Sequence, residues 1–475
     1  MPTQCIIILT VLSVLFSPSF SVWAEDATRM VPLDEFIQTA AASDTVFEEI
    51  LIDELRLRYR KALFIPARDL ILSIKNQYDF ILNQDRNEPE TVIGLTKLFP
   101  HSGTSVSAEY STFPTLSSGT NSSELSFSVS QSIARNAFGK GTQLLDKIIG
   151  LEIQVARHQI VEAYEDYLAA IIFAYVDWYE FFQKADIAQA SYNENVKLLD
   201  NLKEREKNKI ALAVDVNKIR IQVYEKEESL ITITEEYQRR LNTVKTILRY
   251  EGNEILIPQN PDSFFTAEYK FEDDFKQFIQ QSRTYQVFDV LEKKSSFEID
   301  KNADDLLPSI NLFAGLAMDG SRELFHQADN VVFVGVDMEW SFPYQVERAE
   351  LETSKIQLEK TRLSNTNAHY RLYRDIKNLY LNLKQERNLY DIAQKKNVLA
   401  KAVLDDETQN YLYGKITLND FIRAVNTYDN NRFDIAARDA QIKRLMLERM
   451  RILDKLVTRN QINERHKISI QEENN

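Results

Sequence analysis

Two aspartates occupy matching places in this chain and are its most distinctive candidates for a chemical role. Asp215 precedes Val216 and Asp420 precedes Phe421, so the two aspartates are separated by an offset of 205 (420 − 215 = 205). Each follows a short break in a helical pattern, at 209–214 and 413–419. A carboxylate in the first turn of a helix accepts hydrogen bonds from free backbone N–H groups and is favoured by the helix dipole. We therefore expect both aspartates to serve the first turn of the helix that follows.

The other reactive residue types are not grouped in any pattern that supports catalysis. The five histidines are scattered singly, without the spacing of paired metal ligands, at His101, His158, His326, His369 and His466. The sequence has no Gly-rich phosphate loop and no nucleophile elbow. It therefore predicts no catalytic residue, no cofactor site and no metal site, and we do not expect an enzyme.

The spacing of the aspartates belongs to a longer repeat. Tyr175 corresponds to Tyr380 at the same offset, and upstream Pro66 corresponds to Pro308 at an offset of 242 (308 − 66 = 242). A unit of this size is too long for a solenoid repeat of about 20–50 residues. We predict a first repeat at 25–252, a linker at 253–270, a second repeat at 271–457, and a polar, disordered tail at 458–475.

The segment 1–24 has the features of a secretory signal peptide. An apolar run from Cys5 to Phe16 is followed by small residues and by Ala24, after which we expect cleavage. Cys5 is the only cysteine, so the mature chain is expected to have neither a disulfide nor a thiolate metal site. The signal predicts an exported protein.

Two stretches without glycine or proline, 151–251 and 344–413, predict very long helices. Seventy such residues would form a helix about 100 Å long. Apolar residues of the first stretch recur at alternating three- and four-residue steps, which is typical of coiled-coil packing, at Tyr164, Leu168, Ile171, Tyr175, Trp178 and Phe182. Shorter helices are expected at 43–64 and 273–305, after a polar lead at 25–42.

Six runs predict strands, at 70–80, 92–98, 105–110, 125–131, 310–318 and 331–340, and the alternation of strand spacing is clearest at 70–80 and 125–131. The first repeat is longer by 37 between its proline and its tyrosine (242 − 205 = 37), and the excess includes the hairpin at 92–110. Such strands are typical of transmembrane β-structure. They are too few to close a barrel alone, and an open edge cannot lie in lipid, so several chains would have to contribute. The same strands could instead cap a soluble helical bundle, and the pattern leaves both readings open.

The charge and hydropathy of the chain narrow its partners. Its net charge is −14, which argues against nucleic acid, because a nucleic-acid binder needs a basic surface. No window of 18 apolar residues occurs in the mature chain, so no transmembrane helix is expected there.

The order of helix, proline, strands and two long helices, given twice after a signal peptide, resembles the TolC family of outer-membrane efflux and secretion channels. Short strings carry the likeness in detail, namely 307–312, 334–340, 131–135 and, best of all, the run YLYGKITLNDF at 411–421. The resemblance implies a mainly α fold with a small transmembrane β part. It implies a homotrimer in which each chain gives four strands to a shared β-barrel and long helices to a periplasmic α-helical barrel.

The resemblance also implies partners and a gate. The two helix breaks would lie at the periplasmic tip, which meets a periplasmic adaptor (membrane fusion) protein of an inner-membrane pump, while the strands contact outer-membrane lipid. Tyr411 stands where a family tyrosine reaches the aspartate equivalent to Asp215, and Asp420 where a family aspartate faces the pore. Gly414 interrupts the second helix, at the place of a lysine in the first, and Arg423 departs from the family by replacing a second aspartate. The residues of this predicted gate are Asp215, Tyr411, Gly414, Asp420 and Arg423.

We therefore expect the outer-membrane exit channel of a tripartite efflux system, a passive duct that needs no cofactor. One alternative is the outer-membrane component of type I protein secretion, which would act by the same mechanism on polypeptide cargo. An alternative of another class is a periplasmic coiled-coil scaffold without a pore. The sequence does not distinguish the possible cargoes.

Overall fold

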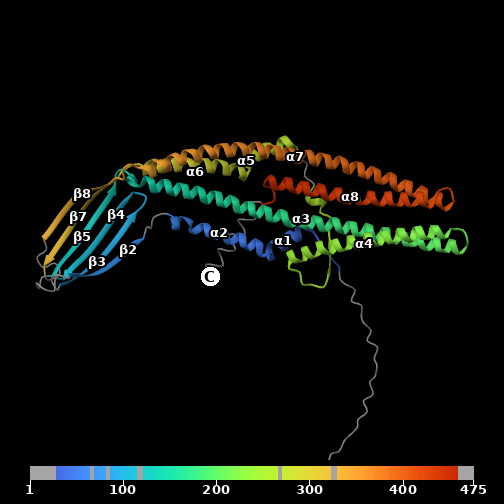
Figure 1. The fold of residues 1–475 in the computed structure, drawn as a ribbon, viewed down its shortest axis with the longest axis horizontal. Helices are drawn as coiled ribbons and strands as arrows, with labels where there is room; N and C mark the ends of the chain where they lie inside the picture. The colour runs from blue at the N-terminus through green and yellow to red at the C-terminus, as the bar shows by residue number, and fades with distance from the viewer. Residues whose placement is uncertain are drawn as a thin grey trace, which may run out of the picture.

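The protein is an elongated rod with a β-sheet at one end and two long helical hairpins at the other (Figure 1). The structure is a computed structural model and describes residues 28–64, 69–81, 86–114, 121–265, 270–321 and 329–457. The expected signal peptide at 1–24 and the expected tail at 458–475 lie outside the described residues. Within the described part of the chain, no helix combines the length and the apolar character needed to cross a membrane.

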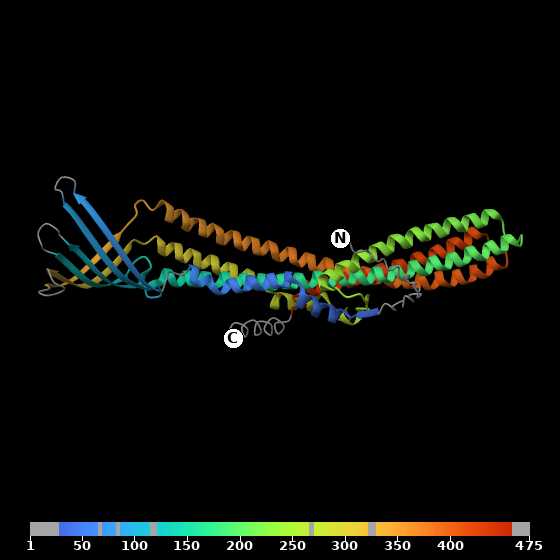
Figure 2. The ribbon, with the colours of Figure 1, turned by 90° about the horizontal axis from the view of Figure 1, so that it is seen from below.

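Four long helices make up most of the rod and display the repeat directly. Helices α3 (Lys140–Lys207) and α7 (Gln345–Leu412) are equally long, and their starts are separated by an offset of 205 (345 − 140 = 205). Helices α4 (Ala213–Leu248) and α8 (Leu418–Ile452) return along them, and their starts show the same offset (418 − 213 = 205). The offset read from the sequence is thus the offset between the two helical hairpins, which lie side by side in both views (Figure 1, Figure 2).

The aromatic seam of α3 supplies the main core of the rod. Tyr175 and Trp178 are fully buried, and they pack in one cluster with Leu383 of α7 and Leu447 of α8. The predicted coiled-coil seam is therefore confirmed for its central residues. Because the cluster joins residues of both repeats, the two helical hairpins of one chain fold as a single unit.

The two equivalent tyrosines anchor the long helices to different neighbours. The hydroxyl of Tyr175 donates to the carbonyl of Val31 at 2.7 Å and accepts from the backbone N–H of Gln259 at 3.0 Å. It thereby holds β1 (Thr28–Val31) and β6 (Ile255–Pro258), a parallel pair, against α3. The hydroxyl of Tyr380 instead bonds the carboxylate of Asp274. Burial raises the pKa of both tyrosines, so both hydroxyls keep their protons and remain donors.

The shorter helices differ from the sequence expectation in two places. The expected polar lead at 25–42 contains helix α1 (Leu33–Ser43), whose Phe36 and Ala40 are one turn apart and fully buried. The helix expected at 273–305 is broken into α5 (Phe271–Gln281) and α6 (Arg283–Asp305), because Ser282 is extended and its side chain caps α6 through the N–H of Thr284. Helix α2 (Thr45–Phe64) lies close to its predicted bounds. The expected linker holds β6 and the turn η2 (Asp262–Phe265).

All six predicted strands form one antiparallel sheet. Its order is β2-β3-β4-β5-β7-β8, so sequence neighbours are also spatial neighbours. The strands are β2 (Leu70–Ile81), β3 (Arg86–Phe99), β4 (Thr104–Pro114), β5 (Asn121–Ser132), β7 (Ser309–Ser321) and β8 (Asp329–Glu339). The family resemblance implied four strands per chain, and the structure corrects this number to six. The difference is the β3–β4 hairpin in the first repeat.

A close backbone contact fixes the sheet to the helical rod. Gly139, just before α3, has a left-handed φ of +78°, and a Cβ built on it would lie 2.4 Å from the carbonyl carbon and oxygen of His101. His101 belongs to the turn between β3 and β4, and its carbonyl also accepts from the side-chain amide of Gln143 at 2.8 Å. The sheet and α3 therefore meet through backbone that leaves no room for a side chain.

We expect Gly139→Ala to lower the free energy of unfolding by about 2 kcal/mol or more, because alanine adds the cost of a left-handed φ to the clash with His101. Gly150→Ala is the matched control, since Gly150 lies inside α3 and a Cβ placed there would have nothing within 4 Å. That change should stabilise the protein by up to about 1 kcal/mol, because alanine is the better helix former. Thermal unfolding followed by circular dichroism measures both. Equal destabilisation by the two changes would contradict the assigned contact.

Candidate functional site: a two-faced sheet and a helical tip

One face of the sheet carries apolar residues on all six strands, interrupted by Lys97 near one end of β3. On β5, Phe127 and Val129 point to this face, and the strand register places Phe127 opposite Ala108 of β4 and Leu316 of β7. The face continues from there across β3 and β2 on one side and β8 on the other, at Leu95, Leu72 and Val332. Many of its residues are strongly exposed, Val334 by 78%. So broad an exposed apolar surface requires an apolar environment or a partner.

The opposite face of the sheet is mostly small and polar. It carries alternate residues of the same strands, including Ser107 of β4 and Ser128 of β5, whose hydroxyls are hydrogen-bonded at 2.7 Å. A few larger apolar side chains interrupt it. Among them are the rings of Phe313 and Phe333, which fill the space left by glycines on the neighbouring strand. Polar and apolar residues therefore largely separate onto two faces, as they do when a sheet divides lipid from water.

Both edges of the sheet are open in the single chain. β2 and β8 are the end strands, and within the described sheet each has a paired neighbour on one side only. Their outer N–H and C=O groups form a template for another strand. Because strand directions alternate from β2 to β8, β8 of one chain would meet β2 of a second copy in the same antiparallel sense.

At the far end of the rod, the two helical hairpins turn through equivalent loops. Lys209 has φ of +59° and Gly414 has φ of +71°, and the two positions again differ by the repeat offset (414 − 209 = 205). Glycine adopts this left-handed conformation without cost, whereas lysine is mildly strained there. The structure thus places Gly414 in the backbone turn of the second tip, and Lys209 in the same turn of the first.

The two aspartates act locally at the starts of their helices. Thr417 caps α8, its hydroxyl accepting from the N–H of Asp420 at 3.3 Å and donating to the carboxylate of Asp420 at 2.7 Å. Arg423 forms an ion pair with the same carboxylate. The hydroxyl of Thr417, with Arg423 adding, holds the pKa of Asp420 below its usual range. Asp215 lies in the first turn of α4, 3.9 Å from the ammonium of Lys218.

Tyr411 connects three helix ends at the tip. Its ring stacks on Phe421 of α8 with ring centres 5.3 Å apart, and the guanidinium of Arg205 lies 5.7 Å from the centre of the same ring. Burial raises the pKa of Tyr411; the charge of Arg205 lowers it and that of Asp215 raises it, so Asp215 lies within electrostatic reach. Sequence reasoning missed Arg205, for which the available signal was a basic residue in the last turn of α3.

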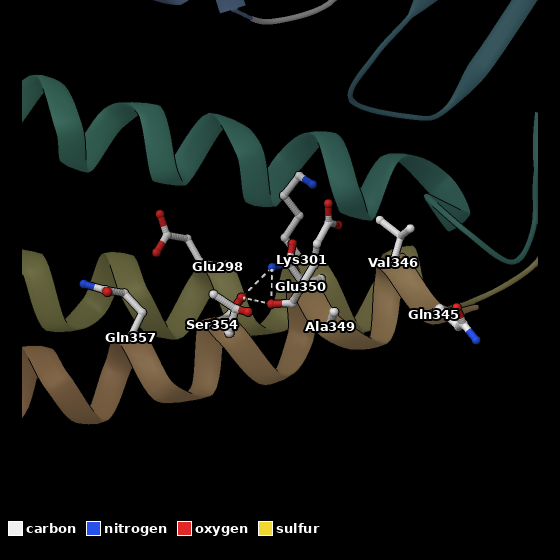
Figure 3. A pocket seen from close by; sticks show the side chains of 10 residues that line it. Glu298, Lys301, Gln345, Val346, Ala349, Glu350, Ser354 and Gln357 are labelled. Carbon is white, nitrogen blue, oxygen red and sulfur yellow. Dashed lines mark hydrogen bonds between the residues drawn. The ribbon is translucent and has the colours of Figure 1, made fainter. Parts of the chain in front are cut away.

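Near the sheet, a groove of about 720 Å³ opens between α6 and α7 (Figure 3). Lys301 and Glu298 of α6 line one side, and Glu350 and Ser354 of α7 the other. Here the amide of Asn302 donates to the carbonyl of Glu350 at 3.4 Å, and the hydroxyl of Ser354 donates to the same carbonyl at 2.8 Å. A hydrogen bond therefore crosses the groove from α6 to α7, and the groove is open to the outside.

In the described part of the rod next to the sheet, helix α3 has a neighbouring helix on both sides, whereas helix α7 has one on one side only. Glu152 of α3 pairs with Arg60 of α2 at 3.1 Å and with Lys294 of α6 at 2.9 Å, so α3 lies between α2 and α6. Helix α6 packs against both α3 and α7. Large apolar residues remain exposed on the outer sides of α2 and α7, among them Tyr59, Leu63, Ile356 and Leu363. Both flanks of the chain therefore expose large apolar residues.

No cluster of three or more His, Cys, Asp and Glu side chains in the described part of the chain is arranged to hold a metal ion. The two notable regions are instead a two-faced sheet with open edges and a helical tip with aromatic and charged contacts.

The same arrangement, an antiparallel sheet joined to two antiparallel pairs of very long helices, occurs in solved structures of outer-membrane channels. Among solved structures, the chain is similar to CusC, solved in a study of transmembrane channel formation, with a TM-score of 0.71, 11% identity, and coverage of 91% of this chain and 95% of that one. It is also similar to the open state of the MtrE outer membrane channel of Neisseria gonorrhoeae, with a TM-score of 0.68, 11% identity, and coverage of 88% of each chain.

A third similar structure is the CmeC outer membrane channel of Campylobacter jejuni, with a TM-score of 0.66, 10% identity, and coverage of 97% of each chain. The resemblance to the TolC family is thus confirmed at the level of the fold. No family model matches the sequence, and no curated protein matches it either. The fold is therefore shared at a sequence identity too low to transfer residue roles.

Proposed function

We propose that this chain is the outer-membrane exit channel of a tripartite efflux system, a passive homotrimeric duct that works with a periplasmic adaptor and an inner-membrane pump. The observation that carries the proposal is the two-faced sheet with two open edges. Its apolar face suits lipid and its serine-rich face suits a water-filled lumen. The open edges must be closed by other copies, because unsatisfied backbone groups in lipid cost several kcal/mol each.

The flanks of the rod support an assembly of identical copies. Helix α2 has α3 as a neighbour on one side, and its exposed Tyr59 and Leu63 face outward on the other. The exposed stripe of α7, with Ile356 and Leu363, lies on the opposite flank. Packing α2 of one copy beside α7 of the next would repeat the α3–α6 pairing within the chain and continue the helices into a closed α-helical barrel. The resemblance to the TolC family, which implies a homotrimer, favours three copies.

The tip is the proposed gate. Tyr411 is held by Phe421 and Arg205, and Asp420 is held by Thr417 and Arg423. The contact between Tyr411 and Arg205 ties the second hairpin to the end of α3, so it favours a closed tip. The contacts of Phe421, Thr417 and Arg423 brace the second hairpin itself. An adaptor would dock on the exposed apolar residues of the two turns, Ile210, Leu212, Leu412 and Tyr413, and draw the hairpins apart. The pump supplies the energy, and the duct needs no cofactor.

The exposed apolar face is the specific reason to prefer a channel over a soluble scaffold. A scaffold in the periplasm would leave this face in water, where each fully exposed valine or leucine forgoes about 1.5–3 kcal/mol of burial. Release of the protein from membranes by carbonate would favour the scaffold instead.

Conductance of the purified protein in planar bilayers tests the channel and its gate together. We expect Tyr411→Ala to raise the conductance or open probability several-fold, because the contact of its ring with Arg205 of the first hairpin contributes about 0.5–1 kcal/mol in every copy. Tyr411→Phe is the matched control, since it keeps the ring in place, and it should behave like the wild type.

An absence of ion current from the wild type and from Tyr411→Ala alike would overturn the proposed channel. A current that rises equally in Tyr411→Phe would show that the hydroxyl, rather than the ring, closes the gate.

A further inference from the structure

The first repeat contains one hairpin more than the second. Between α6 and α7, at 306–344, the described chain forms the two strands β7 and β8. Between α2 and α3, at 65–139, it forms four strands. The additional pair lies inside the sheet rather than at its rim, because the order is β2-β3-β4-β5. Strand β2 therefore reaches the rest of the sheet only through β3 and β4.

The additional hairpin is bonded into the sheet along its full height. Strand β2 pairs with β3 from Leu70 opposite Lys97 to Ile81 opposite Arg86. Strand β4 pairs with β5 over a similar length, from its first residue to its last. A side-chain bond reinforces one end of this second pair, where the hydroxyl of Thr104 donates to the amide oxygen of Gln131 at 2.6 Å. The hairpin is thus a structural part of the sheet.

The apolar face and the polar face of the sheet both continue across the additional hairpin, each on the same side as in the neighbouring strands. Leu95 and Ala108 belong to the apolar face, in the same row as Phe127. Ser107, one residue before Ala108, faces Ser128 on the polar side. A hairpin that served as a surface flap would have no reason to keep this alternation in register with its neighbours.

The width of the sheet matches the width of the helical layer beneath it. Four helices of each chain, α2, α3, α6 and α7, lie next to the strands in the sequence. At interaxial distances of about 8–10 Å they span roughly 36 Å of a ring. Six strands spaced about 4.8 Å apart and tilted about 40° span roughly 37 Å, whereas four strands span only about 25 Å. With the additional hairpin, the sheet of one chain is therefore about as wide as the layer of four helices to which it is joined.

We propose that the β3–β4 hairpin is part of the membrane wall, so that three copies close an 18-stranded barrel rather than the 12-stranded barrel that two hairpins per copy would give. This inference rests on the proposed channel function, and it determines the diameter of the pore in the membrane. Barrel diameter grows about linearly with strand number, so the pore is about half as wide again, and roughly 35 Å across between backbones. A barrel of 16–18 strands leaves an open aqueous channel. The membrane section then admits larger cargo than a 12-stranded barrel would, and selection by size falls to the helical tip.

Cysteine labelling tests whether the hairpin lines the wall, because the only native cysteine is Cys5, in the expected signal peptide. Ser107→Cys and Ala108→Cys probe the two faces of the hairpin, and Ala317→Cys and Ala314→Cys probe the same two faces on β7. The full chain is placed in lipid nanodiscs and treated with a charged maleimide. We expect Ser107→Cys and Ala317→Cys to react at least tenfold faster than Ala108→Cys and Ala314→Cys. Native mass spectrometry of the same samples should give three copies.

The labelling distinguishes a failure of the wall from a failure of the channel. Alternation on β7 but not on the hairpin would overturn the 18-stranded wall and leave the proposed channel standing. Loss of alternation on both would overturn the membrane sheet and, with it, the proposed function. An assembly of two copies would also overturn the 18-stranded wall, since it would close only 12 strands.

Discussion

Replacing Phe127 with arginine should lower the free energy of unfolding in lipid by about 2–4 kcal/mol per chain, whereas arginine at the adjacent Ser128 should be tolerated. Phe127 lies in the middle of β5 on the apolar face, opposite Ala108 and Leu316. A guanidinium there would have to enter hydrocarbon, while at Ser128 it would enter a water-filled lumen beside Ser107. The two positions are adjacent, so strand propensity and location along the pore are nearly equal.

The measurement is urea unfolding in lipid vesicles, together with the yield of detergent-resistant oligomer in the membrane fraction. Phe127→Leu provides a second control, because it removes the ring while keeping the face apolar, and it should retain most of the assembly. Equal costs for arginine at Phe127 and Ser128 would indicate that neither face meets lipid. A larger cost at Ser128 would reverse the assignment of the two faces.

The sequence predicted the features of this fold that depend on local periodicity. All six strands were predicted, most clearly where apolar and small polar residues alternate, as in the run from Leu125 to Gln131. The long helices were predicted because glycine and proline are absent from most of their length and their apolar seam is regular. Helix α1 was missed, since it is short and its buried Phe36 and Ala40 alone do little to distinguish it from a polar segment. The spacing of apolar residues identifies a helix only when it repeats over several turns, and α1 is too short for that.

The candidate site depended more on contacts distant in sequence. Asp215 and Asp420 were predicted at helix starts, and the structure places both in first turns. Arg205 was missed although it lies against the ring of Tyr411, because the two residues belong to different repeats and the meeting of α3 with α7 at the tip decides their contact. The size of the sheet also needed the structure, since the hairpin at 92–110 could have been a peripheral loop until its place between β2 and β5 was seen.

The middle of the rod contains a buried ionic cluster that we expect to be its fixed point. The carboxylate of Asp274 on α5 accepts from Nε of Arg449 at 2.9 Å, from Nζ of Lys455 at 3.0 Å and from the hydroxyl of Tyr380. The cluster joins α5 to α7, to α8 and to the chain just beyond α8. If the hairpins move apart at the tip, another part of the rod must remain in place. The cluster around Asp274 can be that part, because it ties both helices of the second hairpin to one carboxylate.

Arg449→Met should therefore lower the free energy of unfolding by about 3–5 kcal/mol, because it leaves a buried carboxylate with too few donors. Arg449 is 3% exposed and Asp274 is 7% exposed. The same substitution at the tip, Arg423→Met, is the matched control. Arg423 also pairs with an aspartate, but its side chain is 76% exposed, so its loss should leave the stability nearly unchanged. Equal effects of the two changes would refute the burial argument.

The pH dependence of the variant gives an independent test. Burial alone would raise the pKa of Asp274, but hydrogen bonds from Tyr380, Arg449 and Lys455 hold it below the usual value of 3.8. In the wild type this carboxylate thus contributes stability that is present above pH 3.8 and is lost as the pH falls through the folded-state pKa.

In Arg449→Met, burial should dominate and raise the pKa of Asp274. Protonation of Asp274 would then remove the buried charge that destabilises the variant as the pH falls towards about 4. The difference in unfolding free energy between Arg449→Met and the wild type should consequently narrow at low pH. Adding Asp274→Asn to Arg449→Met should recover part of the lost stability at neutral pH. A gap that stays constant with pH would mean that Arg449 acts through packing rather than through the charge of Asp274.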